Sequence, residues 1–293
     1  MRRAPLRHAL EHALFLPFYG LVRLLPHAAS RRLGERLGAL AHALDRSHRR
    51  VALDNLAHAL PELGAEERWR LVAVCFRHFG ALFADVLSAR RFDLPAFCRR
   101  GDIAGLDHLR AAEAAGRGVL FLTAHYGNWE VLPFYLTIAG GPVSVVGRAA
   151  DNPHFDRTVR RLRERFGNRT LDKRGAVREM FRVVREGGRL GLLIDQRVRA
   201  EEGIEVEFFG RPALTSPIVA RLAARSGAPI VPVFGDHRPG GRYRVEIRPP
   251  LWPEGGDDRA ATHELTRRCL AVCEEIIRGA PARWLWMHRR WQR

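Results

Sequence analysis

The sequence predicts an α/β fold in which helices flank a mostly parallel sheet and a helical appendage precedes it. Over the first hundred residues, apolar positions recur at the three-to-four-residue spacing of amphipathic helices. From about Gly101, short apolar runs alternate with helical segments, which is typical of a parallel sheet covered on both faces. We therefore expect a helical region over residues 1–98 and an α/β domain over residues 99–293.

The first predicted helix is strongly apolar. Its stretch ALFLPFYGLVRLL (residues 13–25) has 13 residues, is interrupted by Pro17 and Arg23, and falls short of the roughly 20 residues that span a bilayer. No small-residue cleavage site follows, so we predict no signal peptide. Arginines flank the stretch on both sides, so it either lies in the interface of an anionic leaflet or packs on the protein's own core. On the first alternative, residues 1–98 form a membrane-associating region.

The remaining elements follow from the local periodicity. Further helices of the appendage are predicted over residues 31–44, 48–60 and 66–89. In the α/β domain, apolar runs of strand length predict strands over residues 118–124, 141–147, 189–195, 203–210, 228–237 and 241–250. Helical spacing predicts helices over residues 129–140, 152–167, 176–188, 216–227 and 261–279.

The formal net charge is +17, and arginine supplies nearly all of the positive charge because Lys173 is the single lysine. A bias in base composition accounts for this as readily as function does. Such a charge attracts nucleic acid, acidic proteins or an anionic membrane. The arginines are scattered and no nucleic-acid motif is present, so we do not expect nucleic acid as a partner.

The four cysteines are too dispersed for a metal site. Cys269 and Cys273 are close, but Cys75 and Cys98 form no second pair, so the sequence predicts buried free thiols and no bound metal.

A histidine ends the apolar run of residues 118–124, and a glutamate follows five residues later. Residues five apart on one helix point about 140° away from each other, so His125 and Glu130 meet only if a helix starts between them. Gly127 permits a tight turn there, and Asn128 can cap a helix that contains Glu130. We expect His125 at the carboxyl end of a strand, where α/β sheets bind ligands, with Glu130 accepting from one ring nitrogen. A histidine at a sheet edge without chemistry is the alternative.

These residues carry a resemblance. The segment RGVLFLTAHYGNWE is similar to the signature of the late acyltransferases of lipid A biosynthesis, which are related to glycerolipid acyltransferases with a His-x4-Asp motif. Further blocks follow in the order of that family: NLAHALPELGAEER, LGLLIDQR, FFGRPALTSPIVARLAARSGAPIVPVF and PARWLWMHRRWQR.

The resemblance implies transfer of a fatty acyl group from acyl carrier protein to a hydroxyl of a lipid A precursor, without a cofactor. It places the protein on the cytoplasmic face of the inner membrane, bound to its anionic leaflet. His125 would remove the proton from the acceptor hydroxyl, Glu130 would stabilise the imidazolium, and amides at the start of the Asn128 helix would bind the oxyanion. An alternative acceptor is phosphatidylinositol mannoside or another amphiphile, with acyl-coenzyme A as donor.

Four residues at the ends of two predicted strands are candidates for binding the head group. Arg148 follows a strand and can hold a phosphate or carboxylate, or can be a solvated surface residue. Asp195, Gln196 and Arg197 end another strand, where they suit sugar hydroxyls and phosphate or form a loop ion pair.

Aromatic residues suggest contacts with acyl chains and membrane. Phe209 with Arg211 would provide an apolar wall beside a cation, suited to an acyl chain, although core packing is the alternative. The C-terminal segment interleaves Trp284, Trp286 and Trp291 with arginines, which predicts a place at the membrane interface.

Overall fold

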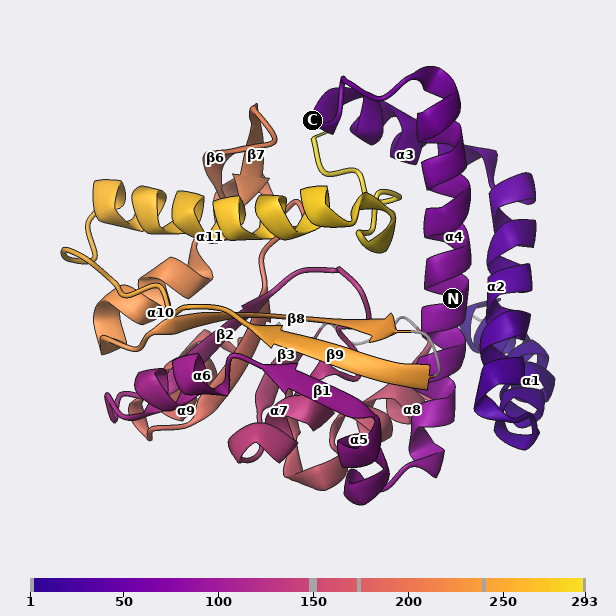
Figure 1. Cartoon of the computed structure of the whole chain (residues 1–293), viewed down its shortest axis with the longest axis horizontal. Coiled ribbons are helices and arrows are strands. Elements are labelled where there is room, and N and C mark those ends of the chain that lie inside the picture. The colour runs from indigo at the N-terminus through magenta and orange to yellow at the C-terminus, as the bar shows by residue number, and fades with distance from the viewer. Residues whose placement is uncertain (1–2, 148–151, 173–174, 239–240, 292–293) are drawn as a thin grey trace.

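The N-terminal helices form a wall beside a central sheet (Figure 1). The computed structural model describes residues 3–147, 152–172, 175–238 and 241–291. The wall consists of α1 (Arg3–Leu24), α2 (His27–Leu44), α3 (Arg46–Ala59) and α4 (Ala65–Ser88). Helices α2 and α4 approach closely because glycines face each other: a Cβ on Gly34 would lie 2.3 Å from the Gly80 carbonyl oxygen.

The sheet has seven strands in the order β1-β9-β8-β2-β5-β3-β4. All neighbouring pairs are parallel except β8 and β9, so the predicted mostly parallel α/β fold is confirmed. The strands are β1 (Gly101–Ala104), β2 (Val119–Thr123), β3 (Ser144–Gly147), β4 (Arg169–Asp172), β5 (Arg189–Leu193), β8 (Ile230–Arg238) and β9 (Arg242–Ile247). A separate hairpin pairs β6 (Ile204–Phe208) with β7 (Arg211–Thr215).

Helices cover both faces of this sheet. They are α5 (Leu94–Arg100), α6 (Leu106–Glu113), α7 (Leu132–Gly140), α8 (Pro153–Arg163), α9 (Val177–Arg185), α10 (Ile218–Ser226) and α11 (Arg259–Gly279). The central strand β2 is buried throughout, and its alternating side chains enter two cores: Leu120 and Leu122 one, Phe121 the other. This is why its sequence is an uninterrupted apolar run.

Helix α4 lies across the end of the sheet toward which β8 points (Figure 1). It contributes Val72 to one core and Val86 to the other, so the helical wall and the sheet share buried surface. The boundary between residues 98 and 99 stays a prediction.

Among the described residues, α4 is the one helix with the length and hydropathy of a membrane span, and 61% of that apolar window is buried inside the protein. Of the four cysteines, Cys75, Cys269 and Cys273 are buried free thiols as expected, whereas Cys98 is exposed.

Candidate active site

His125 lies just beyond the carboxyl end of β2, in a loop that runs to the start of α7 at Leu132. Gly127 makes the turn with φ +58°, and a Cβ there would lie 2.0 Å from the Gly235 carbonyl oxygen. The expected cap by Asn128 is wrong, because the helix begins four residues later. Asn128 is instead buried, and its backbone N–H donates to the Gly235 carbonyl over 3.0 Å.

The carboxylate that holds His125 belongs to Asp195, which follows the neighbouring parallel strand β5. His125 Nδ1 donates to Asp195 Oδ1 over 2.9 Å, and its backbone N–H donates to Oδ2 over 2.8 Å. Trp284 Nε1 also donates to Oδ2, over 2.7 Å. Asp195 is therefore fully enclosed and satisfied by three donors, and it fixes both the ring and the backbone of His125.

Asp195 stays ionised in this enclosed position. Burial raises the pKa of its carboxyl, but the charge of His125 and the hydrogen bonds from His125 and Trp284 outweigh burial, so the pKa lies below its ordinary value. His125 keeps 21% of its side chain exposed, and its Nε2 has no hydrogen-bond partner in the part of the chain that the structure describes. The arrangement gives a ring nitrogen that can accept a proton, backed by a fixed negative charge.

Glu130 does not take the expected position on the His125 ring. Its carboxylate instead accepts from Arg163 at the end of α8, with Nε 2.7 Å from Oε2 and a second bond from the same guanidinium. Burial lowers the pKa of Arg163, yet the hydrogen bond and charge of Glu130 raise it overall. The expectation that Glu130 accepts from a His125 ring nitrogen is therefore wrong in its geometry. Glu130 joins the active-site loop to α8.

The other candidate residues divide into exposed and enclosed groups. Arg148 lies outside the described residues. Gln196 is partly exposed and Arg197 exposed, so both remain accessible to a ligand, whereas the buried Asp195 cannot meet a sugar hydroxyl. This corrects the assignment of Asp195, whose oxygens are turned toward His125 and Trp284.

Phe209 is also corrected, because it is buried in an aromatic core against Trp284 and Trp286, with centroids 6.3 and 6.0 Å away. It turns the β6–β7 hairpin with φ +53°, and its N–H donates to Glu274 over 2.7 Å. Arg211, two residues later, is exposed. The two residues thus do not form one wall.

Of the three C-terminal tryptophans, Trp284 and Trp286 lie inside the protein, and Trp291 is partly exposed. Trp284 and Trp286 are 1% and 0% exposed, and Trp291 stacks on Phe208. Arg290 is buried among them and donates to the Leu214 carbonyl over 2.6 Å. The prediction of an interfacial segment is wrong for Trp284 and Trp286, because a mixture of tryptophan and arginine also suits a core in which the indole N–H groups and the guanidinium find hydrogen-bond acceptors.

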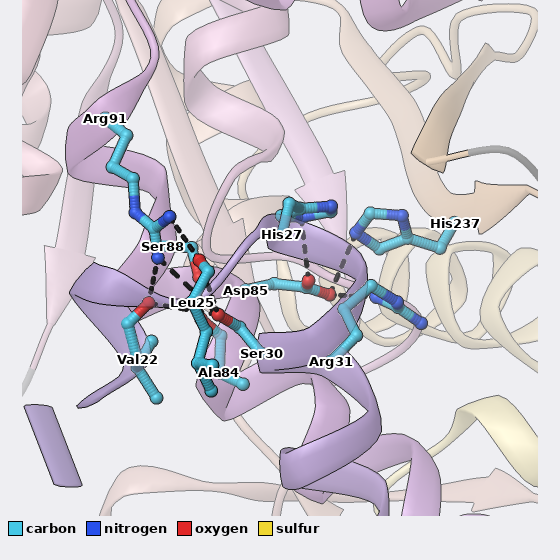
Figure 2. Close-up of polar contacts among 10 residues, drawn as sticks. All are labelled: Val22, Leu25, His27, Ser30, Arg31, Ala84, Asp85, Ser88, Arg91 and His237. Carbon is cyan, nitrogen blue, oxygen red and sulfur yellow. Dashed lines mark hydrogen bonds and ion pairs between the residues drawn. The ribbon is translucent and has the colours of Figure 1, made fainter.

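A second aspartate–histidine cluster lies beside α4 (Figure 2). Asp85 is buried, and its carboxylate oxygens lie 3.1 Å from His27 Nε2 and 2.8 Å from His237 Nε2 and accept a hydrogen bond from Arg31. Burial opposes its ionisation, but the close approach of His237 and His27 and the charge of Arg31 lower the pKa of Asp85 to about 2.

This cluster fits a metal ion poorly. Within the described ranges, His27, Asp85 and His237 are the group whose ligand atoms lie close enough together, within 4.8 Å of one another. However, both Nε2 atoms already lie against the carboxylate as ion-pair partners, and the Arg31 guanidinium supplies the positive charge that a metal ion would bring. We therefore interpret the cluster as an ion-paired support.

The chain is similar to known proteins over nearly its whole length. Residues 2–293 match the family model described as bacterial lipid A biosynthesis acyltransferase. A lipid A biosynthesis lauroyltransferase of Escherichia coli is 27% identical, covering 93% of this chain and 88% of its own. A phosphatidylinositol mannoside acyltransferase of Mycobacterium tuberculosis is 28% identical, covering 81% and 75%. The crystal structure of the 1-acyl-sn-glycerophosphate acyltransferase PlsC from Thermotoga maritima is 16% identical, with a TM-score of 0.39 and coverage of 72% and 88%.

Proposed function

Because the chain belongs to the bacterial lipid A biosynthesis acyltransferase family, we propose that it moves a fatty acyl group from acyl carrier protein to a hydroxyl of a lipid A precursor. The observation that carries the mechanism is His125, whose Nδ1 is bound to the buried Asp195 while Nε2 is left without a partner among the described residues. A histidine in this arrangement is a general base.

The reaction follows from that geometry. His125 Nε2 takes the proton of the acceptor hydroxyl as the oxygen attacks the thioester carbonyl. The C–S bond then breaks, and the departing thiolate receives the proton from the imidazolium. Asp195 remains ionised throughout and stabilises the imidazolium, which is the role that the sequence had suggested for Glu130.

The oxyanion needs donors, and the backbone of the loop limits the choice. The amides of Tyr126, Gly127 and Asn128 already donate to Ala124, Arg283 and Gly235 carbonyls. In the described chain, the amides of Trp129 and Glu130 have no such partner, and the Trp129 ring lies 5.0 Å from the His125 ring. We assign these two amides as the oxyanion donors.

The donor and acceptor are separable by experiment. Purified protein is incubated with acyl carrier protein or coenzyme A thioesters, and with a lipid A precursor or a phosphatidylinositol mannoside, and products are read by mass spectrometry. We expect one added acyl chain on the lipid A precursor, with the carrier-protein thioester preferred. Transfer only to phosphatidylinositol mannoside from acyl-coenzyme A would replace this proposal by the alternative acceptor, for which relatives of that name exist.

Membrane attachment is proposed for the outer surface of α1 and α2. These helices expose six leucines: Leu16, Leu21, Leu24, Leu37, Leu40 and Leu44. Leucines on the surface of an arginine-rich region suit an anionic leaflet, which we take to be the cytoplasmic face of the inner membrane. The buried C-terminal tryptophans take no part.

Alkaline carbonate extraction tests this attachment. An interfacial protein is released at least in part, and high salt alone loosens it. Complete retention in the pellet would mean that the N-terminal region spans the bilayer.

A further inference from the structure

A cavity of about 710 Å³ opens at the end of the sheet where α2, α5 and β8 meet. Its wall carries five arginines and one glutamate: Arg31, Arg32, Arg100, Arg238, Arg283 and Glu35. The size is that of a pocket for a small ligand or a head group, since such pockets measure roughly 300–1,000 Å³.

Three of these arginines are available to a ligand. Arg31 is bound to Asp85, and Arg283 is bound to Asp236 over 3.1 Å. Arg32, Arg100 and Arg238 have no carboxylate partner among the residues that the structure describes, although Arg100 lies over the Phe92 ring. Glu35 is a single opposing charge, so the cavity attracts anions.

Contacts made by Asp85 and Arg91 hold the residues of the cavity wall in place. Asp85 binds His27, Arg31 and His237, which come from α2 and β8, and all three line the cavity (Figure 2). Arg91 donates to the carbonyls of Val22 and Leu25, which fixes the turn that leads into His27. His237 Nδ1 is buried and has no hydrogen-bond partner in the described chain.

One residue, Arg283, connects the cavity with the loop that carries His125. Arg283 lines it, while the Arg283 carbonyl accepts from the Gly127 N–H over 2.9 Å in the loop of His125. Two residues later, the Leu285 N–H donates to the His125 carbonyl over 3.1 Å. An anion in the cavity is therefore next to the loop on which the acyl group is transferred.

We propose that this cavity binds a phosphate group of a substrate during acyl transfer, an inference that rests on the proposed function. Arginines without partners suit phosphate because a guanidinium donates two parallel hydrogen bonds to its oxygens. Two sources share this chemistry: a phosphate on the glycolipid acceptor, and the phosphodiester of the phosphopantetheine that carries the acyl thioester. Bound phosphate would orient the substrate, and the hydroxyl or thioester would reach His125 from there.

The test uses the double variant Arg32→Gln/Arg238→Gln in the full chain. Its matched control is Arg221→Gln, which changes an exposed arginine on α10, away from the cavity. Inorganic pyrophosphate is first titrated against each protein at constant ionic strength. Wild type and the control should bind it with the same affinity, and the double variant should bind at least about tenfold more weakly. Equal binding by all three proteins would overturn the proposal.

Kinetics then identify the source of the phosphate. If the acceptor supplies it, the double variant should raise the KM for a phosphorylated acceptor about 10- to 100-fold, and much less for the dephosphorylated acceptor. If the donor supplies it, the KM should rise for acyl-phosphopantetheine and not for acyl-pantetheine. A KM that rises only for the carrier-protein thioester would make the cavity a protein-docking surface and overturn the proposal.

The two proposals fail separately. Wild type could transfer no acyl group and still bind the phosphorylated glycolipid more tightly than its dephosphorylated form. If the double variant then loses that difference in affinity, the proposed function is wrong and the phosphate-binding cavity is supported. If transfer proceeds and neither pyrophosphate binding nor any KM depends on Arg32 and Arg238, the cavity assignment falls alone.

Discussion

Two buried aspartates at the same end of the sheet are each bound to histidine, yet they are built for different purposes. Asp195 is in contact with one ring nitrogen, one backbone amide and one indole, and with no guanidinium among the described residues. Asp85 contacts two histidines and also Arg31. The charge of Asp85 is thus already balanced by a permanent cation, whereas Asp195 gains a full cationic partner in contact only when His125 takes a proton. We infer that an aspartate beside a histidine promotes catalysis when no permanent cation already balances its charge.

The largest effect should follow from removing the His125 ring. His125→Ala should lower turnover by at least about 10³-fold, because it removes the proposed general base. His27→Ala, the counterpart in the second cluster, should cost less than about tenfold on a dephosphorylated acceptor. Steady-state kinetics on both proteins, with folding checked by circular dichroism, test this. Comparable losses in the two variants would remove the distinction between the clusters.

The two carboxylates should differ in what they affect. Asp195→Asn should lower kcat by roughly 10²–10⁴-fold with little change in KM, because the amide cannot stabilise the imidazolium. Asp85→Asn should instead lower the free energy of unfolding by about 3 kcal/mol, since Arg31 loses a buried ionic partner. Kinetics and urea unfolding of both variants measure the contrast. A wild-type kcat in Asp195→Asn would contradict the proposed difference between the two aspartates.

Glu130 should act through Arg163 and so have a smaller effect than Asp195. Glu130→Gln and Arg163→Gln should each lower kcat by about 10²-fold, because either change releases the loop from α8. The double variant should be no worse than either single one, since both disrupt the same contact. Additive losses would mean that Glu130 contacts the substrate independently of Arg163.

The smallest effect concerns His78, which lies between the two clusters. Its Nε2 donates to the Gly127 carbonyl over 3.0 Å, and its Nδ1 accepts from Arg283 over 2.9 Å. Burial and then the charge of Arg283 lower the pKa of His78 to about 3. The unfolded chain binds this proton from about pH 6.5, so stability is full above that pH and falls as the pH drops toward 3.

Replacing this histidine measures its contribution to acid sensitivity. The slope due to His78 should be at most about 1.4 kcal/mol per pH unit. In His78→Gln, the unfolding free energy between pH 6.5 and pH 5 should depend less on pH than in wild type. An unchanged slope would show that other groups govern acid unfolding.

Some of this organisation was predictable from the sequence, and the missing parts have physical reasons. The apolar run of β2 predicts that His125 follows the carboxyl end of a strand, because buried parallel strands have nearly continuous apolar sequences. The partner Asp195 was placed at a strand end but not against His125, since the adjacency of β2 and β5 depends on strand order. His125 and Asp195 each follow a buried apolar strand, and this shared position could have suggested that their side chains meet.

Short elements and aromatic composition account for the other differences. The sequence does not predict β1 and β4, because their four residues, GDIA and RTLD, include charged side chains. Strand β3 is equally short, but its apolar residues SVVG make it recognisable. Composition predicts a membrane interface for the tryptophans near the C-terminus because it does not distinguish an interface from a core. The burial of Trp284 and Trp286 decides between the two.

The contribution of Trp284 also sets an order in time for the growing polypeptide. The indole that completes the environment of the carboxylate follows Asp195 by 89 residues in the sequence. The Arg283 and Leu285 backbone groups that hold the His125 loop belong to the same later segment. Until this later segment has been synthesised and has packed, β2 and β5 can pair, but the contact between His125 and Asp195 lacks the indole that completes it. In a growing polypeptide, the proposed general base is therefore completed later than the strands that carry it.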